Sequence, residues 1–204
     1  ILERMTASLC DEVLEAQHGG ETASTPTGSQ ETLEYLEGAN LFVVPLDGER
    51  RWYRYHHLFA ELLRGRLHQR QPDLVPVLHR RASRWYEARG LIDGAIGHAL
   101  GGGDVKRAAD LVEEHGLQMV VRSECSTLAK WLEQLPEEVV RARPWLCVCY
   151  AWARYYVGPR DQVEPWLQDA ERRMANVELA ALSDVEGRYV AGHIAALRAY
   201  MALQ

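Results

Sequence analysis

The sequence lacks four short motifs that mark catalytic and metal sites. It contains no phosphate-binding G-x-x-x-x-G-K-[ST], no H-E-x-x-H, no paired C-x-x-C and no G-x-S-x-G. The first absence excludes nucleotide hydrolysis by this chain alone. The others leave no metal centre or activated nucleophile with a recognisable spacing. We therefore predict that these 204 residues are not an enzyme and hold no catalytic residue, metal ligand or cofactor.

Lysine is nearly absent, since only Lys106 and Lys130 join the arginines among the 23 basic residues. The net charge of -6 argues against a chain whose whole surface binds nucleic acid. No apolar run is long enough to span a membrane, and no signal peptide is visible, so we expect no membrane partner. The cysteines have no framework spacing, which predicts free, buried thiols in a reducing cytoplasm. They are Cys10, Cys125, Cys147 and Cys149.

Both ends of the chain resemble internal positions of a longer protein. The chain opens with "ILERM", without an initiator methionine, and stops at "LRAYMALQ" inside a helical pattern. We expect a segment of a longer protein, truncated within its last helical region.

The first 72 residues predict a winged-helix-like module. Apolar spacing predicts a helix over residues 1–17 and another over 31–39, separated by a flexible Gly/Ser/Thr/Pro loop at 18–30. "LFVVPLDGERRWYRY" follows as the one hairpin signal, with Asp47-Gly48 at its turn. A two- or four-residue turn there puts one set of residues on a common face: Phe42, Val44, Leu46, Arg51, Tyr53 and Tyr55. Trp52, Arg54 and His56 then point to the other face.

From residue 73 to 204 the pattern predicts helices throughout, arranged in pairs. Three stretches align with a separation of 34 residues, which is the tetratricopeptide (TPR) period. Stacked helix pairs bury the apolar face that each pair leaves open. The overall prediction is a mainly α fold, with a one-hairpin winged-helix-like module followed by a TPR-like superhelical array. The aligned positions are Gly90, Glu124 and Gly158, with Ala95, Ala129 and Val163 at the small, packed position.

Aromatic residues of the helical region are expected to pack between repeats rather than contact a ligand. These are Tyr86, His98, Trp131, Trp152 and Trp166. The last helix carries a further stripe that we expect to remain uncovered and to self-associate. That stripe comprises Val185, Tyr189, His193, Leu197 and Met201.

Direct DNA binding through the hairpin is an alternative. Arg50, Arg51 and Arg54 lie where a wing can contact a phosphate backbone. The helix before the hairpin, "QETLEYLEGAN", carries three glutamates and no arginine or lysine. It is therefore poorly suited to read DNA, which a winged helix usually does with this helix. We predict no DNA-binding residues in the chain.

Three stretches resemble a known family: "ANLFVVPLDGERRWYRYHHLFAELLRGRL", "LHRRASRWYEARGLIDGAIGHAL" and "DVKRAADLVEEHG". They are similar to the MalT-like, large ATP-binding regulators of the LuxR class, which are signal-transduction ATPases. Those proteins join a nucleotide-binding domain, a winged-helix module, a superhelical sensor of helix pairs and a C-terminal helix-turn-helix. The resemblance implies that this chain covers the second part and the start of the third. ATP or ADP would bind an upstream domain, and DNA an absent C-terminal one.

In the wider class of these ATPases, a Met-His-Asp motif opens the helix after the wing, and its histidine contacts the β-phosphate of ADP. Tyr55-His56-His57-Leu58 resembles that position, which implies an ADP phosphate contact for His56 in the full-length protein. His57 replaces the acidic residue, so the companion capping role does not carry over. A histidine at a helix N-terminus can donate an N–H to an anion. The alternative is that His56 caps its own helix or lies beneath the hairpin.

We therefore predict a regulatory segment of an ATP-dependent transcriptional regulator. It would couple nucleotide state, and an inducer or regulatory protein bound on the concave side of the helix pairs, to activation of transcription. Its first partner would be the nucleotide-binding domain of the same chain. The alternative from a different class is a generic TPR-like interaction scaffold without a nucleotide switch.

Overall fold

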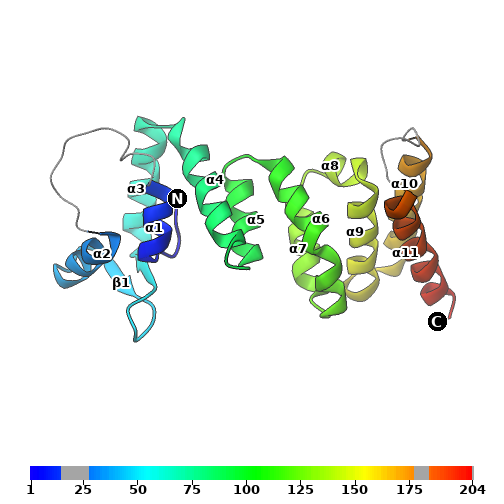
Figure 1. Cartoon of the computed structure of the whole chain (residues 1–204), viewed down its shortest axis with the longest axis horizontal. Helices are drawn as coiled ribbons and strands as arrows, with labels where there is room; N and C mark the ends of the chain where they lie inside the picture. The colour runs from blue at the N-terminus through cyan, green and yellow to red at the C-terminus, as the bar shows by residue number, and fades with distance from the viewer. Residues whose placement is uncertain (15–27, 177–183, 204) are drawn as a thin grey trace. The chain divides into compact units, whose positions relative to one another are not determined.

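The computed structural model describes residues 1–14, 28–176 and 184–203, and these form two compact units. Unit 1 is Ile1–Asp104 and unit 2 is Val105–Gln204. The described part is mainly helical, and its strands form a single two-stranded hairpin, which confirms the predicted fold class (Figure 1).

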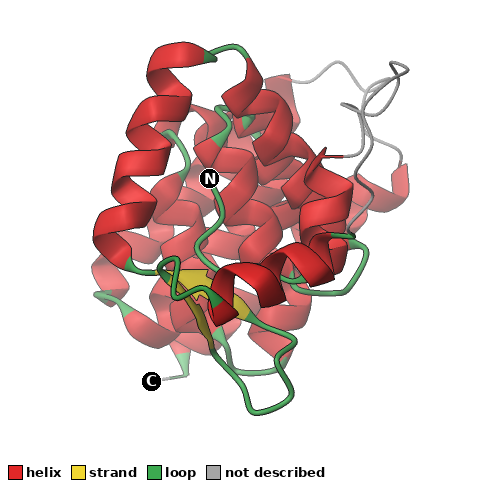
Figure 2. Ribbon diagram, turned by 90° about the vertical axis from the view of Figure 1, so that its left-hand side faces the viewer, coloured by secondary structure: helices red, strands yellow, loops and turns green. Residues whose placement is uncertain are grey.

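Unit 1 contains five helices and the hairpin among its described residues. The strands and the loop that joins them are yellow and green in Figure 2. The elements are α1 (Ala7–Leu14), α2 (Ser29–Gly38), β1 (Val43–Pro45), β2 (Tyr53–Tyr55), α3 (His57–Arg70), α4 (Leu74–Glu87) and α5 (Ile92–Gly101).

The first helix begins later than predicted. The hydroxyl oxygen of Thr6 accepts a hydrogen bond from the backbone N–H of Leu9 at 3.1 Å, so Thr6 caps the N-terminus of α1. Met5, predicted to be helical, instead forms an isolated bridge with Tyr53, with both N···O distances at 2.8 Å. The N-terminal residues thus contribute a short extended segment beside β2. Most of the predicted loop at 18–30 lies outside the described residues, and Ser29 and Gln30 belong to α2.

Helix α4 joins the winged-helix elements to the first helix pair. Leu78 and Trp85 of α4 share a buried cluster with Leu9 and Val13 of α1. Unit 1 therefore continues past residue 72, and a functional boundary at that residue stays a proposal.

The hairpin register differs by one residue from the predicted register. The observed partners are Val43 with Tyr55, Val44 with Arg54, and Pro45 with Tyr53. The physical reason is the loop, which has five residues, 47–51, rather than the predicted two or four.

Asp47 organises this loop through its side chain. Its carboxylate accepts hydrogen bonds from the backbone N–H of Arg51 at 2.9 Å and of Trp52 at 3.2 Å. Arg50 takes a positive φ of 53°. The N–H of Leu46 then donates to the carbonyl of Trp52 at 2.7 Å, which closes the loop and sets the register.

The α4–α5 pair contains two histidines in direct contact. The Nδ1 atoms of His79 and His98 lie 3.1 Å apart, and the ring of Tyr86 stacks on His98. A Cβ at Gly101 would lie 2.7 Å from the His79 ring, so the backbone of α5 and this ring are in close contact. Burial lowers the pKa of both histidines, that of His98 to about 4. The pair is therefore neutral near pH 7, with one ring donating and the other accepting.

Unit 2 continues the helical pairs. Its described elements are α6 (Val105–Val121), α7 (Cys125–Gln134), α8 (Glu137–Ala142), α9 (Pro144–Val157), the 3-10 helix η2 (Arg160–Gln162), α10 (Val163–Asn176) and α11 (Asp184–Ala202). Helix α9 lies against α6, α7, α10 and α11, and nine of its fourteen residues are buried, in keeping with its apolar sequence. A Cβ at Gly116 of α6 would lie 2.9 Å from the sulfur of Cys149, so the helices approach closely there.

The 34-residue repeat corresponds to helix pairs α4–α5, α6–α7 and α9–α10. Gly90, Glu124 and Gly158 each lie shortly before the second helix of a pair. The residues at the small, packed position are all buried, as predicted: Ala95, Ala129 and Val163.

The stripe that the sequence predicts to be uncovered on the last helix is only partly so, because Tyr189 is exposed but Leu197 is fully buried. Leu197 is buried together with Val190 and Ile194. Val185 lies outside the described side chains. The reason is that α11 packs against two helices, with its aromatic residues toward α9 and Arg198 toward α10.

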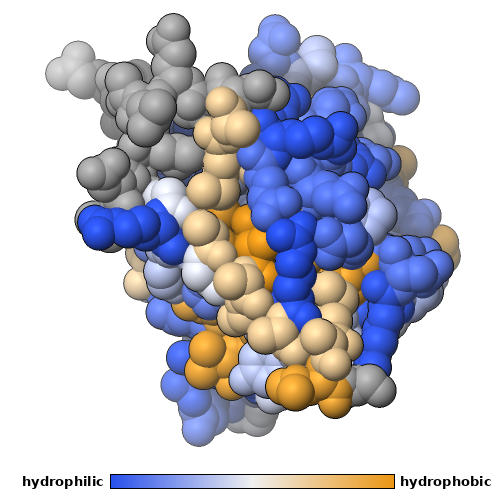
Figure 3. Space-filling model, turned by 90° about the vertical axis from the view of Figure 1, so that its right-hand side faces the viewer, coloured by the Kyte–Doolittle hydropathy of each residue, from blue (hydrophilic) through white to orange (hydrophobic). Residues whose placement is uncertain are grey.

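Apolar side chains also reach the surface at this end of unit 2, as a pale-orange band in Figure 3. A groove of about 200 Å³ between α10 and α11 is lined by Met174, Ala191, Ile194 and Ala195, together with the ion pair of Glu171 and Arg198. Self-association through this end of the chain stays a prediction.

The four cysteines are free thiols, and all except Cys10 are buried. Burial raises the pKa of the Cys147 thiol to about 11, so it is a neutral, apolar side chain at pH 7. Within the described ranges, no helix is both long enough and apolar enough to cross a bilayer.

Acid should weaken the α4–α5 pair, because the folded protein disfavours protonated His98. Its pKa of about 4 lies below the ordinary value of 6.5, so this stabilisation is present above pH 6.5 and is lost as the pH falls toward 4. By pH 5 the loss is on the order of 2 kcal/mol. Urea unfolding at pH 7.5 and pH 5 should show a smaller pH dependence in His98→Phe, which keeps a ring on Tyr86. An equal pH dependence in both proteins would contradict the assignment.

Candidate functional site

The observed register creates an exposed face on the hairpin, which we call the wing face. A shift of one residue moves every side chain of a strand to the opposite side. Val43 and Tyr53 consequently lie in the core with Met5 and Leu33. Of the residues that alternate with them, Trp52 packs against the buried cluster of α1 and α4. The wing face consists of the exposed ones: Phe42, Val44, Leu46, Arg54 and His56.

Phe42 occupies a strained position on the wing face. Its φ is 61°, in the left-handed region that bulky residues rarely adopt, and 55% of its surface is exposed. Its ring stacks on Phe59 of α3, with centroids 4.9 Å apart. Such a conformation costs on the order of 1–3 kcal/mol and is found disproportionately at functional sites.

His56 is the last residue before α3, and its side chain is exposed on the wing face. Its backbone N–H donates to the carbonyl of Phe42 at 2.7 Å, which fixes its position. The imidazole makes no capping hydrogen bond to the helix and lies 4.4 Å from the ring of His57. His56 thus occupies the N-cap position of α3 without a side-chain capping bond, and its exposed side chain does not lie beneath the hairpin.

The charge around His56 suits an anion. The first turn of α3 carries no acidic residue, so the positive end of the helix dipole is not compensated there. Arg54 shares the face with His56. No base stands beside a nucleophile in this cluster, so the arrangement supports binding rather than catalysis.

The three arginines of the DNA-binding alternative do not form one patch. Arg50 pairs with Glu37 of α2 at 3.3 Å, and Arg51 pairs with Glu49 in the hairpin loop. Arg54 alone lies on the wing face. Two of the three charges are thus already balanced by carboxylates, which weakens the case for contact with a phosphate backbone.

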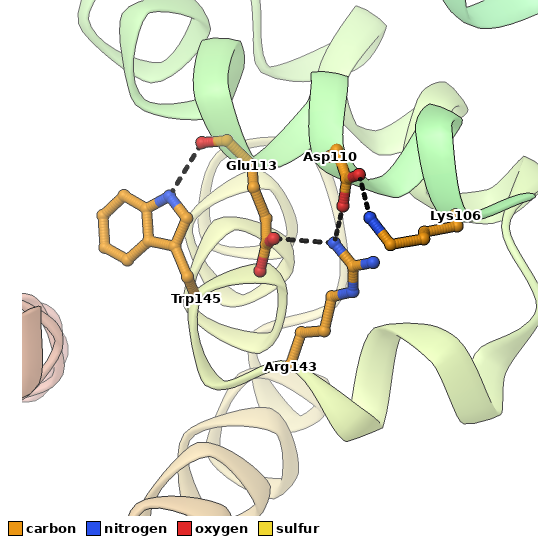
Figure 4. Close-up of polar contacts among 5 residues, drawn as sticks. All are labelled: Lys106, Asp110, Glu113, Arg143 and Trp145. Carbon is orange, nitrogen blue, oxygen red and sulfur yellow. Dashed lines mark hydrogen bonds and ion pairs between the residues drawn. The ribbon is translucent and has the colours of Figure 1, made fainter. Parts of the chain in front are cut away.

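A second polar cluster, in unit 2, has a structural explanation. Arg143, just before α9, bonds to Asp110 and Glu113 of α6 at 2.7 Å each, and Lys106 bonds to Asp110 at 2.7 Å (Figure 4). The indole N–H of Trp145 donates to the carbonyl of Glu113 at 3.1 Å. These bonds attach the start of α9 to α6. Burial raises the pKa of Glu113 although Arg143 opposes this.

No group of three or more histidine, cysteine, aspartate or glutamate side chains converges as a metal site in the part of the chain that the structure describes. The rings of His56 and His57 lie close together, with centroids 4.4 Å apart, but no third such side chain joins them among the described residues.

Residues 1–75 match the family model of the MalT winged helix domain. The HTH-type transcriptional regulator MalT of Klebsiella pneumoniae (strain 342) is 33% identical over 146 residues, which cover 72% of this chain and 16% of that protein. MalT of Vibrio cholerae serotype O1 is 32% identical over 186 residues, covering 88% and 20%. The serine/threonine-protein kinase PknK of Mycobacterium tuberculosis (strain CDC 1551 / Oshkosh) is 36% identical over 127 residues, covering 62% and 11%.

Fold and sequence together define a winged-helix domain that leads into TPR-like helix pairs. Within that class the chain is MalT-like, and residues 1–75 form its winged-helix domain. This confirms the resemblance seen in the sequence. The chain spans about a tenth to a fifth of the length of these curated relatives.

Sequence reasoning identified His56 but missed its apolar neighbours on the wing face. The predicted register placed Phe42, Val44 and Leu46 on the same face as Tyr53. The six consecutive apolar residues at 41–46 give no alternation that would choose between the two registers. Asp47 was the available signal, because an aspartate at the start of a loop often bonds to later backbone N–H groups.

Replacing Asp47 by Ala removes both side-chain acceptors of the hairpin loop. We expect the free energy of unfolding to fall by about 1 kcal/mol. Glu49→Ala is the matched control, because Glu49 forms only an exposed ion pair, which contributes little. Urea denaturation followed by circular dichroism measures both variants. Equal stability of the two would show that Asp47 does not hold the register.

Proposed function

We propose that this chain is the regulatory segment of an ATP-dependent, LuxR-class transcriptional regulator. The segment itself is not an enzyme. Its wing face docks on a nucleotide-binding domain of the same polypeptide, and His56 contacts the bound nucleotide. The observation that carries the proposal is the exposure of His56 on an apolar, strained face of the winged-helix domain.

The wing face has the composition of a surface that another domain covers. Its apolar centre leaves Phe42, Val44 and Leu46 in contact with solvent. Helix α3 next exposes Leu58, at 63%, and Leu62. Contiguous exposed apolar groups commonly mark interaction sites, because their burial is favourable by about 25 cal/mol per Å². Docking also explains why the strained backbone of Phe42 is retained.

His56 supplies the chemistry that distinguishes nucleotide states. At the start of α3, an imidazole N–H that donates to the terminal phosphate of ADP adds to the attraction of the helix dipole. That contact favours a closed, resting arrangement of the two domains. ATP together with an inducer then shifts the population toward an open, active form, because both bind that form more tightly.

The relatives support a sensing role that does not depend on what the rest of the protein does, whether it regulates transcription or phosphorylates proteins. The same segment is similar to part of proteins named as HTH-type transcriptional regulators and to part of one named as a serine/threonine-protein kinase. Gene regulation and phosphoryl transfer are chemically unrelated activities. A segment found with both is therefore expected to carry out neither of them. We assign to the helix pairs the binding of an inducer or regulatory protein. A generic scaffold without nucleotide sensing would leave the wing face unexplained.

The nucleotide contact is tested in the full-length protein with His56→Ala, using His57→Ala as the matched control. His57 is also exposed and its ring lies beside that of His56, so this variant reports the loss of a neighbouring imidazole. Loss of a hydrogen bond to a charged phosphate should speed ADP release by about tenfold or more for His56→Ala. It should also raise basal transcription.

Stopped-flow release of a fluorescent ADP analogue measures the two rates. Release from His56→Ala at the rate of the unsubstituted protein contradicts the nucleotide contact. Equal acceleration in both variants contradicts the specific assignment to His56.

A further inference from the structure

The chain turns from α2 into β1 through two residues with positive φ. Asn40, with a φ of 55°, ends α2 in a Schellman motif, in which the N–H of Leu41 donates to the carbonyl of Leu36 at 2.8 Å. Asparagine adopts this left-handed conformation more readily than most residues. Phe42, with a φ of 61°, follows Leu41 and directly precedes the buried Val43 of β1. The backbone at position 42 therefore has a conformation that phenylalanine disfavours.

The ring of Phe42 joins the start of β1 to β2 and α3. It stacks on the ring of Phe59, with an interplanar angle of 27° and centroids 4.9 Å apart. Phe59, in the first turn of α3, also meets the ring of Tyr55 at the end of β2, with centroids 5.6 Å apart. Glycine would adopt the positive φ without strain but could not make this stack. The stack is therefore the interaction that a phenylalanine adds at this position.

Phe42 also contacts the main chain at His56. Its carbonyl accepts a hydrogen bond from the His56 N–H at 2.7 Å, and Phe59 lies three residues after His56 in the first turn of α3. The chain is thus held at residue 56 through its backbone and at residue 59 through a ring. The imidazole of His56 makes no capping hydrogen bond to α3, so the backbone of residue 56 determines where this ring is placed.

We propose that Phe42 and Phe59 form a clamp that positions His56 for its contact with the nucleotide. The ring stack keeps the left-handed backbone of Phe42 from relaxing, and the carbonyl of Phe42 holds the start of α3. A donor that is already held in place loses less conformational freedom on binding, which strengthens the contact. This assignment rests on the proposed nucleotide contact of His56 and adds two residues that position it without touching the nucleotide.

The clamp is tested in the 204-residue chain by the hydrogen-exchange rate of the His56 backbone amide, measured by NMR. Phe59→Leu removes the stack and should speed this exchange by about fivefold or more, because the carbonyl of Phe42 is no longer held against the amide. Phe42→Gly, which adopts the positive φ without strain, lacks the ring and should have the same effect. Phe59→Tyr and Phe42→Tyr keep the stack and should exchange like the unsubstituted chain.

Val44→Ala is the matched control for these variants. Val44 is an exposed apolar residue of the wing face, lies on β1 and takes no part in the stack, so its replacement should leave the His56 amide unchanged. Circular dichroism confirms that all variants keep their helices. Exchange at the unsubstituted rate in Phe59→Leu or in Phe42→Gly overturns the clamp, as does equal acceleration in Val44→Ala.

The effect on the nucleotide is measured as ADP release from the full-length protein. Phe59→Leu should speed release by about threefold or more, because His56 must then be ordered on binding. Phe59 lies outside the wing face, so this variant leaves the residues of that face in place. In a His56→Ala background the same substitution should have no further effect, since the clamp acts through His56. Phe59→Tyr should restore the slow release.

These outcomes separate the clamp from the proposed function. Equal acceleration by Phe59→Leu with and without His56 would show a purely structural role and overturn the positioning. If His56→Ala leaves ADP release unchanged, the nucleotide contact fails and the positioning fails with it. The amide exchange in the 204-residue chain contains no nucleotide, so it still decides whether Phe42 and Phe59 hold the backbone of His56.

Discussion

The Asp47 carboxylate accepts two backbone hydrogen bonds in the hairpin loop, and these bonds determine which hairpin residues are exposed to solvent. They fix a loop over residues 47–51 and hence the pairing of Val43 with Tyr55. In that register Tyr53 enters the core of unit 1, and Phe42, Val44 and His56 emerge on the wing face. A shift of one residue would bury apolar side chains that are now exposed, and would place Tyr53 outside. The side chain of Asp47 thus sets the hairpin register, and the register sets the composition of the wing face.

The sequence predicted the elements of the fold better than their boundaries and register. Apolar spacing located most of the helices, and the 34-residue period located the helix pairs, because burial of a stripe or of a small residue such as Ala95 leaves a periodic signal. The start of the first helix was missed because Thr6 caps it, although Met5 continues the apolar spacing. On α11 the sequence predicted an uncovered stripe, but Leu197 of that stripe is buried, because apolar spacing alone does not tell which members a neighbouring helix covers. The position of His56 at the start of α3 came from family resemblance, and its exposure came from the structure.

The wing face combines apolar groups with Arg54, His56 and the positive end of α3. This chemistry suits the proposed docking of a domain that carries a nucleotide phosphate.

The central claim is that the wing face is covered when the full-length protein holds ADP. Hydroxyl-radical footprinting measures this directly, because modification rates of Phe42, Leu58 and Leu62 report the exposure of their side chains. We predict that these residues are modified several-fold more slowly in the ADP-bound full-length protein than in the 204-residue chain. ATP with inducer should restore the faster rates. Equal modification in the 204-residue chain, the ADP-bound protein and the ATP-bound protein would contradict the account.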